Sequence, residues 1–182
     1  KICLGWHSIG GVAGNDTLYS MVSGTKGMNV IAPTWFSMTD ENGAFRSFAT
    51  AGYVTTAHQM GLQVWGVLDN FNYANENGIS ISTLNMLSST TARQNLVKNV
   101  TDTAVGLGLD GINVDFEQLS SDCGPHYVEF LRELSIECRN KGLVLSIDNY
   151  VPFNFNDYYR LDIQGEVADY VIILGYDEHW HG

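Results

Sequence analysis

Hydrophobic residues recur along the chain in short runs, and most of these runs are apolar at both odd and even positions. Runs of this kind are typical of parallel β-strands whose two faces are both covered. The pattern predicts six strands, at residues 2–6, 29–36, 62–68, 111–116, 143–147 and 170–174.

Amphipathic segments separate several of the predicted strands. Residues 91–108 and 124–142 place apolar side chains at helical spacing, which predicts two helices that each bury one face. A third helix is expected at residues 44–60. The stretch at residues 70–90 is rich in Asn, Ser and Thr and is expected to be the longest loop.

The alternation of strands and helices predicts an α/β fold with a parallel sheet, either doubly wound or closed as a barrel. The glycines of "SIGGVAG" at residues 8–14 do not have the G-x-G-x-x-G spacing of a dinucleotide-binding turn, which favours the (β/α)8 TIM barrel. A complete barrel typically needs ~250 residues. We therefore expect residues 1–182 to form one partial barrel domain with about the first six β/α units, strands 7 and 8 being missing.

One predicted strand carries carboxylates on a single face. In "GLDGINVDFEQL", residues 108–119, the even positions 112, 114 and 116 are apolar, whereas the odd positions carry Asn113, Asp115 and Glu117. In a barrel this odd face points inward, and the end of the strand opens onto the active-site face. Asp115 and Glu117 would then lie at the mouth, with Cα atoms about 6.6 Å apart. A solvated edge strand and a carboxylate metal site are the alternatives.

The composition argues against several classes of partner. The net charge is −11 and there is no basic cluster, so neither nucleic acid nor an anionic membrane surface is an expected partner. No apolar run approaches the ~20 residues that a membrane-spanning helix needs. The aromatic content of 12% is compatible with a surface that stacks on rings.

Two segments resemble a known enzyme family. "DGINVDFE" at residues 110–117 resembles the fourth-strand signature of family 18 glycoside hydrolases, D-G-x-D-x-D-x-E, with Asn113 in place of one aspartate. "ILGYDEHW" at residues 173–180 resembles the sixth-strand M-x-Y-D motif of that family through Tyr176 and Asp177. The asparagine and the "YDEHW" ending are most similar to the branch that contains spore cortex-lytic, peptidoglycan-cleaving N-acetylglucosaminidases.

The resemblance implies a glycosidase of the N-acetylglucosaminidase or chitinase type that hydrolyses β-linked N-acetylglucosamine by substrate-assisted, retaining catalysis. Glu117 would be the general acid and then the general base. Asp115 would hold the acetamido N–H and offset the charge of the oxazolinium ion. Tyr176 would donate its hydroxyl to the acetamido carbonyl group, and Asp177 would contact sugar hydroxyls or support Tyr176.

Asn113 is the departure from the family motif. An aspartate there would lie below Asp115 and share a proton or a hydrogen bond with it, but an amide carries no charge. Asp115 would then be repelled less in its ionised form, which predicts a shifted pH optimum. We expect Asn113 to belong to the substrate-binding part of the site.

Other polar and aromatic residues stand at the ends of predicted strands. Trp35 and Asn70 are expected to line the sugar cleft. Asp69, Asp148 and Asn149 occupy similar positions. For each of these residues, a role as a turn or cap residue remains an alternative.

Three functional hypotheses follow. The leading one is a hydrolase of the bacterial cell wall or spore, extracellular, acting on peptidoglycan or a chitin-like polysaccharide without a cofactor. The second is a lectin-like, glycan-binding barrel, which the presence of Glu117 disfavours. The third is a protein whose acidic cleft holds a cation. No metal is expected, because His179 and His181 lack a third ligand at supporting spacing.

Overall fold

The computed structural model describes residues 1–72, 74 and 77–175. Parallel strands form its main sheet, and each of the six predicted segments overlaps one strand of this sheet. Their order across the sheet is β1 (Leu4–His7), β2 (Val30–Pro33), β5 (Gln63–Asp69), β6 (Gly111–Asp115), β7 (Val144–Tyr150) and β8 (Tyr170–Leu174).

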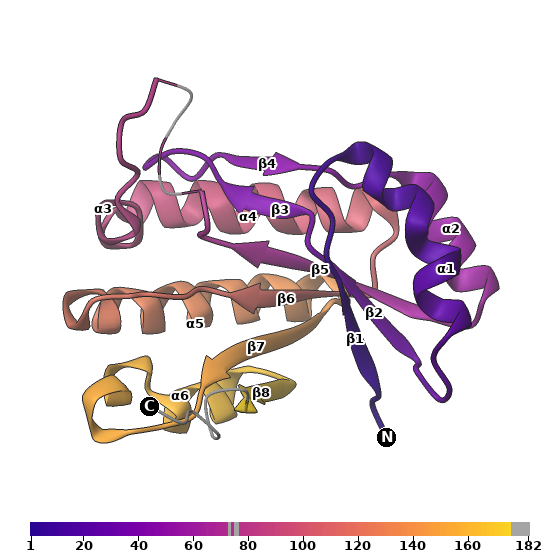
Figure 1. Cartoon of the computed structure of the whole chain (residues 1–182). Helices are drawn as coiled ribbons and strands as arrows, with labels where there is room; N and C mark the ends of the chain where they lie inside the picture. Colours follow the sequence, from indigo (N-terminus) through magenta and orange to yellow (C-terminus); the bar gives the residue numbers. More distant parts are fainter. Residues whose placement is uncertain (73, 75–76, 176–182) are drawn as a thin grey trace, which may run out of the picture.

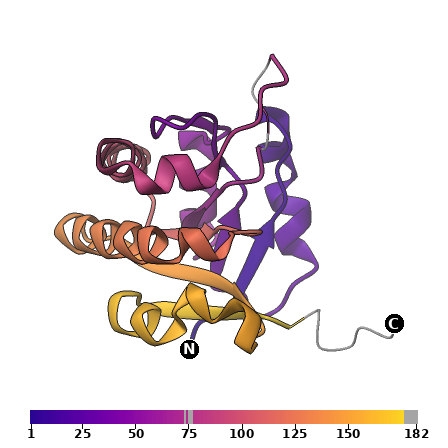
Figure 2. The same ribbon diagram turned by 90° about the vertical axis from the view of Figure 1, so that its left-hand side faces the viewer.

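Helices cover the outer face of this curved sheet, and the result is a half-barrel. Figures 1 and 2 show α4, α5 and α6 side by side along one face. The α-helices are α1 (Leu18–Ser23), α2 (Ala51–Gln59), α3 (Thr83–Ser88), α4 (Thr90–Leu107), α5 (Gly124–Lys141) and α6 (Leu161–Val167). The 3-10 helices are η1 (Val12–Thr17), η2 (Ser121–Cys123) and η3 (Asn154–Tyr159). No helix in the described part of the chain is long and apolar enough to cross a membrane.

The two faces of β6 are as different as its sequence predicts. The side chains at its even positions join the core beneath the helices, where Phe116 stacks on Phe130 of α5 with ring centroids 5.4 Å apart. The odd positions face the interior of the half-barrel. At Gly111, a Cβ atom would lie 2.9 Å from the ring of Trp65 and 2.8 Å from the carbonyl oxygen of Val144, so only glycine fits there.

Two sequence-based boundaries are wrong. The strand expected at residues 29–36 divides into β2 and β3 (Phe36–Met38), because a tight turn brings the Trp35 N–H to the Pro33 carbonyl oxygen at 2.9 Å. The helix expected at residues 44–60 is α2 alone. Ahead of it, β4 (Phe45–Ser47) pairs antiparallel with β3.

The turn between β3 and β4 explains why no helix forms there. One carboxylate oxygen of Asp40 accepts hydrogen bonds from the backbone N–H groups of Asn42 and Ala44, at 2.8 and 3.0 Å. Gly43 has a φ of 90°, and a Cβ atom there would lie 2.3 Å from the carbonyl oxygen of Ala92 in α4. The turn therefore requires a glycine, and it leads the chain into a strand.

The segment expected to be a long loop contains a short helix. α3 and the start of α4 lie within residues 70–90. Ser82 and Ser89 cap these two helices, since each hydroxyl oxygen accepts a hydrogen bond from a backbone N–H in the first turn. The serines that suggested a loop are thus the helix caps.

Candidate active site

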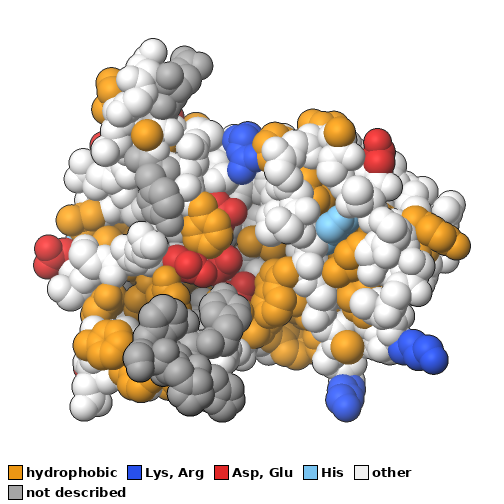
Figure 3. Space-filling model, in the orientation of Figure 1, with side chains coloured by type: hydrophobic (Ala, Val, Ile, Leu, Met, Phe, Trp, Pro, Cys, Tyr) orange, Lys and Arg blue, Asp and Glu red, His pale blue; other side chains and the backbone are white. Residues whose placement is uncertain are grey.

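Three aspartates lie on neighbouring strands at one end of the sheet. Asp69 in β5 is the register partner of Asp115 in β6. Asp148 in β7 follows Ile147, the partner of Val114, so its backbone is level with that of Asp115. Neighbouring strands are about 4.8 Å apart. Figure 3 shows Asp and Glu side chains gathered near the middle of this face, beside exposed hydrophobic groups.

Burial and mutual repulsion change how these aspartates ionise. Burial, followed by the charges of Asp148, Glu117 and Asp69, raises the pKa of Asp115 to about 8. Burial also raises the pKa of Asp148 to about 6, although hydrogen bonds from Asn113 and Trp6 oppose this shift. Both shifts bring the pKa of a carboxyl group towards the neutral range, in which acid–base chemistry operates.

Glu117 follows β6, and its backbone is held from the neighbouring strand. The side-chain amide of Asn70 accepts a hydrogen bond from the Glu117 N–H and donates one to the Glu117 carbonyl oxygen, both at 2.9 Å. Burial raises the pKa of Tyr150 of β7 to about 12, and Glu117 lies close enough for its charge to add to this shift. The hydroxyl of Tyr150 also accepts a bond from the N–H of Gln118, a residue with a φ of 54°. Glu117 is thus positioned from both sides.

Asn70 was expected to line the sugar cleft, but its side chain bonds to other residues of the protein. It is buried, and its amide is used by the protein: besides holding Glu117, its nitrogen donates to the Thr83 hydroxyl at 3.2 Å. Its position at the end of β5 was recognisable from the sequence. The contact that it makes was not, because it depends on the pairing of β5 with β6.

Asn113 lies fully buried in the half-barrel, below Asp115. Its side-chain nitrogen donates to the Ser146 hydroxyl at 2.5 Å and to the Asp148 carboxylate at 3.0 Å. Trp6 completes this network from β1: its indole N–H is 3.2 Å from Asp148 and 3.4 Å from the Asn113 oxygen. The sequence did not lead us to expect Trp6 in the site, although its position at the end of the first predicted strand could have indicated it.

Trp35 does not line an exposed cleft in the described structure. Its side chain is 0% exposed, its indole N–H donates to Asn15 at 2.7 Å, and its ring packs edge-on against Tyr53. The turn that ends β2 directs this side chain into the core. The expectation that Trp35 contacts sugar is therefore corrected.

Asp110, the first aspartate of the motif, lies at the opposite end of β6 from the other carboxylates. One of its carboxylate oxygens accepts hydrogen bonds from the Val64 N–H at 2.8 Å and from the His58 ring nitrogen Nε2 at 2.7 Å. It joins α2 and the start of β5 to β6. Its place in the motif is therefore explained by the fold.

Changing Asp110→Asn tests this structural role. We expect the free energy of unfolding to fall by about 1–2 kcal/mol, because charge-assisted hydrogen bonds to His58 and Val64 are weakened. We expect kcat to be unchanged. Denaturant titration and an activity assay of the same preparation measure both quantities, and a large loss of kcat in a folded variant would contradict this assignment.

Tyr176 and Asp177 lie outside the described residues, as do His179 and His181. Their expected roles stay predictions. Among the residues that the structure does describe, no group of three or more His, Cys, Asp or Glu side chains is arranged to hold a metal ion.

Two cavities flank the carboxylates. On the β5 side, a cavity of about 450 Å³ is lined by residues that include Ser37, Arg46, Asp69 and Phe71. On the β7 side, a cavity of about 380 Å³ is lined by aromatic residues that include Tyr150 and Phe153. A ligand that extends across Asp115 and Glu117 would therefore find a polar surface on one side and an aromatic surface on the other.

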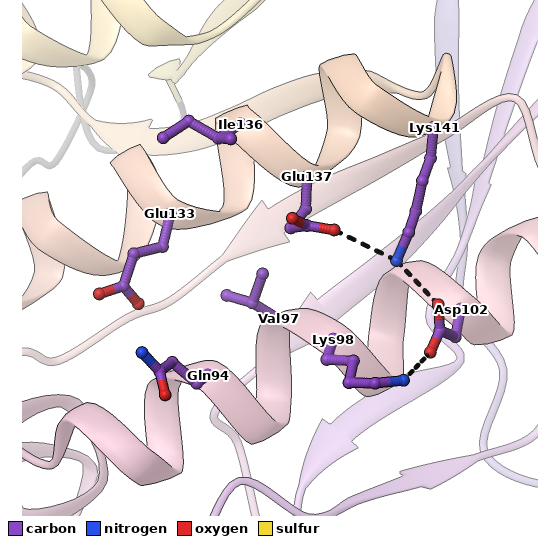
Figure 4. Close-up of a pocket in the computed structure, with 8 residues that line it drawn as sticks. All are labelled: Gln94, Val97, Lys98, Asp102, Glu133, Ile136, Glu137 and Lys141. Atoms are coloured by element: carbon purple, nitrogen blue, oxygen red, sulfur yellow. Dashed lines mark hydrogen bonds and ion pairs between the residues drawn. The ribbon is translucent and has the colours of Figure 1, made fainter.

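A larger cavity, of about 540 Å³, lies between α4 and α5 on the outer, helical side (Figure 4). The charged side chains around it pair with one another. Lys141 bonds Asp102 at 2.8 Å and Glu137 at 3.3 Å, and Lys98 also bonds Asp102. This cavity contains none of the carboxylates at the strand ends, so we assign it no part in the chemistry.

Comparison with known proteins identifies relatives of this chain. The model of the family "Glycosyl hydrolases family 18" matches residues 78–182. A putative sporulation-specific glycosylase, YdhD, of Bacillus subtilis is 35% identical over 104 residues, which is 53% of this chain and 24% of that protein. The cortical fragment-lytic enzyme of Bacillus anthracis is 29% identical over 121 residues, which is 61% of this chain and 27% of that protein. The chain thus spans about a quarter of the length of these two relatives.

Solved structures share the fold. The spore cortex-lytic enzyme SleL of Bacillus cereus has a TM-score of 0.80 at 23% identity, over 98% of this chain and 42% of that one. The YdhD structure from Bacillus subtilis has a TM-score of 0.70 at 26% identity, over 81% of this chain and 50% of that one.

Proposed function

Because this chain belongs to family 18 of the glycosyl hydrolases, we propose that its protein hydrolyses β-linked N-acetylglucosamine, and that its substrate is peptidoglycan. The observation that carries this proposal is the placement of Glu117 beside Asp115 at the carboxyl ends of the strands, with the Glu117 backbone held by Asn70. Two relatives bear names that refer to sporulation and to cortical fragments. We therefore propose the bacterial spore or cell wall as the place of action.

In the proposed mechanism, Glu117 donates a proton to the glycosidic oxygen as the bond to the leaving sugar breaks. The acetamido oxygen of the bound sugar attacks its own anomeric carbon, so no second carboxylate acts as nucleophile. The N–H of the resulting oxazolinium ion is positively charged, and Asp115 accepts its hydrogen bond. Glu117 then takes a proton from water, which attacks the anomeric carbon. Tyr176 and Asp177 are proposed to hold the acetamido group and the sugar hydroxyls.

Product analysis tests this proposal. The full-length protein is incubated with peptidoglycan and with chitin oligosaccharides, and new reducing ends are identified by mass spectrometry. We expect N-acetylglucosamine reducing ends from peptidoglycan. Binding of glycan without any cleavage would contradict the proposal and would support the lectin-like alternative.

Arg46 supports the choice of peptidoglycan over chitin. Among the described residues that line the cavity on the β5 side, it is the only basic one. Its guanidinium lies over the ring of Phe48, 3.9 Å from the centroid, and this contact restricts its movement. In an acidic site such a cation suits a substrate that carries a carboxylate. The peptide stems attached to the muramic acid of peptidoglycan carry free carboxylates, whereas chitin carries none.

The change Arg46→Gln is expected to lower kcat/KM on peptidoglycan fragments that keep their peptide stems about tenfold, since a partly exposed charge-assisted hydrogen bond is lost. On chitin oligosaccharides we expect little change. The two substrates are compared for the wild type and the variant under the same conditions. An equal loss on both would show that Arg46 does not recognise the carboxylate.

A further inference from the structure

The interior of the half-barrel carries a carboxylate that the family motif does not account for. Where the motif places an aspartate, this chain has Asn113, whose nitrogen donates to Asp148 and Ser146 and whose oxygen faces the indole N–H of Trp6. An amide in this state cannot take up a proton. Any proton exchange with Asp115 must therefore involve another group.

Asp148 is positioned to exchange a proton with Asp115. It is 2% exposed and lies on β7, the neighbour of β6, level with Asp115. Each of its carboxylate oxygens has a donor: one accepts from Asn113 at 3.0 Å and the other from Trp6 at 3.2 Å. Both donors are neutral. They orient the carboxylate. An arginine or lysine would also hold it in the charged form, and these two donors do not.

The charges around Asp148 also favour a shared proton. No ion pair within the described residues includes either Asp115 or Asp148. Two neighbouring carboxylates, one buried and one partly buried, with no cation paired to them are more stable with one proton between them than with two negative charges. Among the described residues, the ionisable groups that interact with this pair are Asp69 of β5, Glu117 after the end of β6, Tyr150 of β7 and Tyr127 of α5.

We propose that Asp148 supplies the second carboxylate of this active site, replacing the aspartate that the family motif has at position 113. The proposal rests on the function proposed above. In the free protein, one proton is shared by Asp115 and Asp148. As the acetamido oxygen bonds to the anomeric carbon and Glu117 protonates the leaving oxygen, a positive charge develops on the acetamido nitrogen. The shared proton moves to Asp148, and Asp115 becomes the anion that accepts the N–H. When water opens the oxazolinium ring, the proton returns.

The substitution Asp148→Asn tests the proposal, because an amide keeps the size of the side chain and cannot carry the proton. We expect kcat to fall about 100-fold, within the usual range for loss of a proton-transferring group, with KM changed much less. We also expect the pH profile of kcat to lose the ionisation that the pair contributes. Asp110→Asn, the same change at the other end of β6, is the matched control.

A double variant separates proton sharing from a structural role. Asn113→Asp combined with Asp148→Asn exchanges the amide and the carboxylate while retaining a hydrogen bond between the two positions. It also restores the aspartate of the family motif. We expect kcat to recover at least tenfold over Asp148→Asn alone. Unchanged kcat in Asp148→Asn, or no recovery in a folded double variant, would overturn the proposal.

A measurement that needs no substrate distinguishes failure of this inference from failure of the proposed function. Carbon-13 NMR of the aspartate carboxyl groups follows each ionisation directly. A shared proton predicts that the signals of Asp115 and Asp148 each show two titration steps, and that Asp148→Asn makes the Asp115 titration a single step. Independent single steps in the wild type would overturn the proposal even if the protein cleaves glycan.

Discussion

Replacing Glu117 with glutamine is expected to lower kcat by about 1,000-fold, because the variant keeps the shape of the side chain and loses its ability to donate and accept a proton. The backbone at this position is held by Asn70 through main-chain groups, so the substitution leaves that contact intact. Binding of substrate should therefore persist. The reaction is followed as reducing ends released from peptidoglycan, and binding is measured on the same glycan.

The matched control for this experiment is Glu129→Gln. Glu129 lies on α5 with about half of its side chain exposed, and its nearest cation is Arg132 at 3.9 Å. We expect it to retain wild-type kcat. If Glu117→Gln retained a substantial part of the activity, another group would have to be the general acid, and the proposed mechanism would fail.

Replacing Asp115 with asparagine is expected to make the protein more stable and much less active. Burial and the surrounding carboxylates raise the pKa of Asp115 to about 8, so its charged form is disfavoured in the folded state. Removing this charge should increase the free energy of unfolding at pH 8 by about 2 kcal/mol, a value well below the full effect of the pKa shift because the side chain is partly exposed. We expect kcat to fall at least 100-fold.

The gain in stability from Asp115→Asn is expected to increase with pH. An unfolded aspartate has a pKa of about 3.9, so between pH 4 and pH 8 the folded protein holds more protons at this position than the unfolded protein. Stability must therefore fall as the pH rises through this range. Denaturant titrations of wild type and variant at pH 5 and pH 8 isolate the contribution of Asp115. A stability difference that does not grow from pH 5 to pH 8 would contradict the raised pKa.

The order of the strands and the identity of the inner face could be predicted from the sequence, because both depend on local patterns. The alternation around Asp115 fixes which side chains of β6 face inward, and the apolar runs mark the strands of the sheet. The hairpin of β3 and β4 was not predicted, because its apolar residues also fit a helix and the turn depends on Gly43 packing against α4.

The roles of the polar residues at strand ends could not be read from the sequence. Asn70 and Asp148 belong to residue types that are equally common in turns and helix caps. What distinguishes them is the partner on the neighbouring strand: Glu117 for Asn70, and Asn113 for Asp148. Such contacts depend on the register between strands that are distant in the sequence. The environment of Trp35 was also not predictable. Its position at a strand end suggested an exposed side chain, but a tight turn buries it.

The contact between Trp6 and Asp148 gives this protein a fluorescent reporter of its own. Trp35 and Trp65 are fully buried, whereas Trp6 is 39% exposed and is expected to emit at longer wavelength than these two. Its indole N–H lies 3.2 Å from the carboxylate of Asp148, whose pKa is raised to about 6 by burial. The emission intensity of Trp6 therefore depends on the charge of Asp148. A glycan that covered the indole would shift the emission to shorter wavelength, so protonation and occupancy can be followed optically without a label.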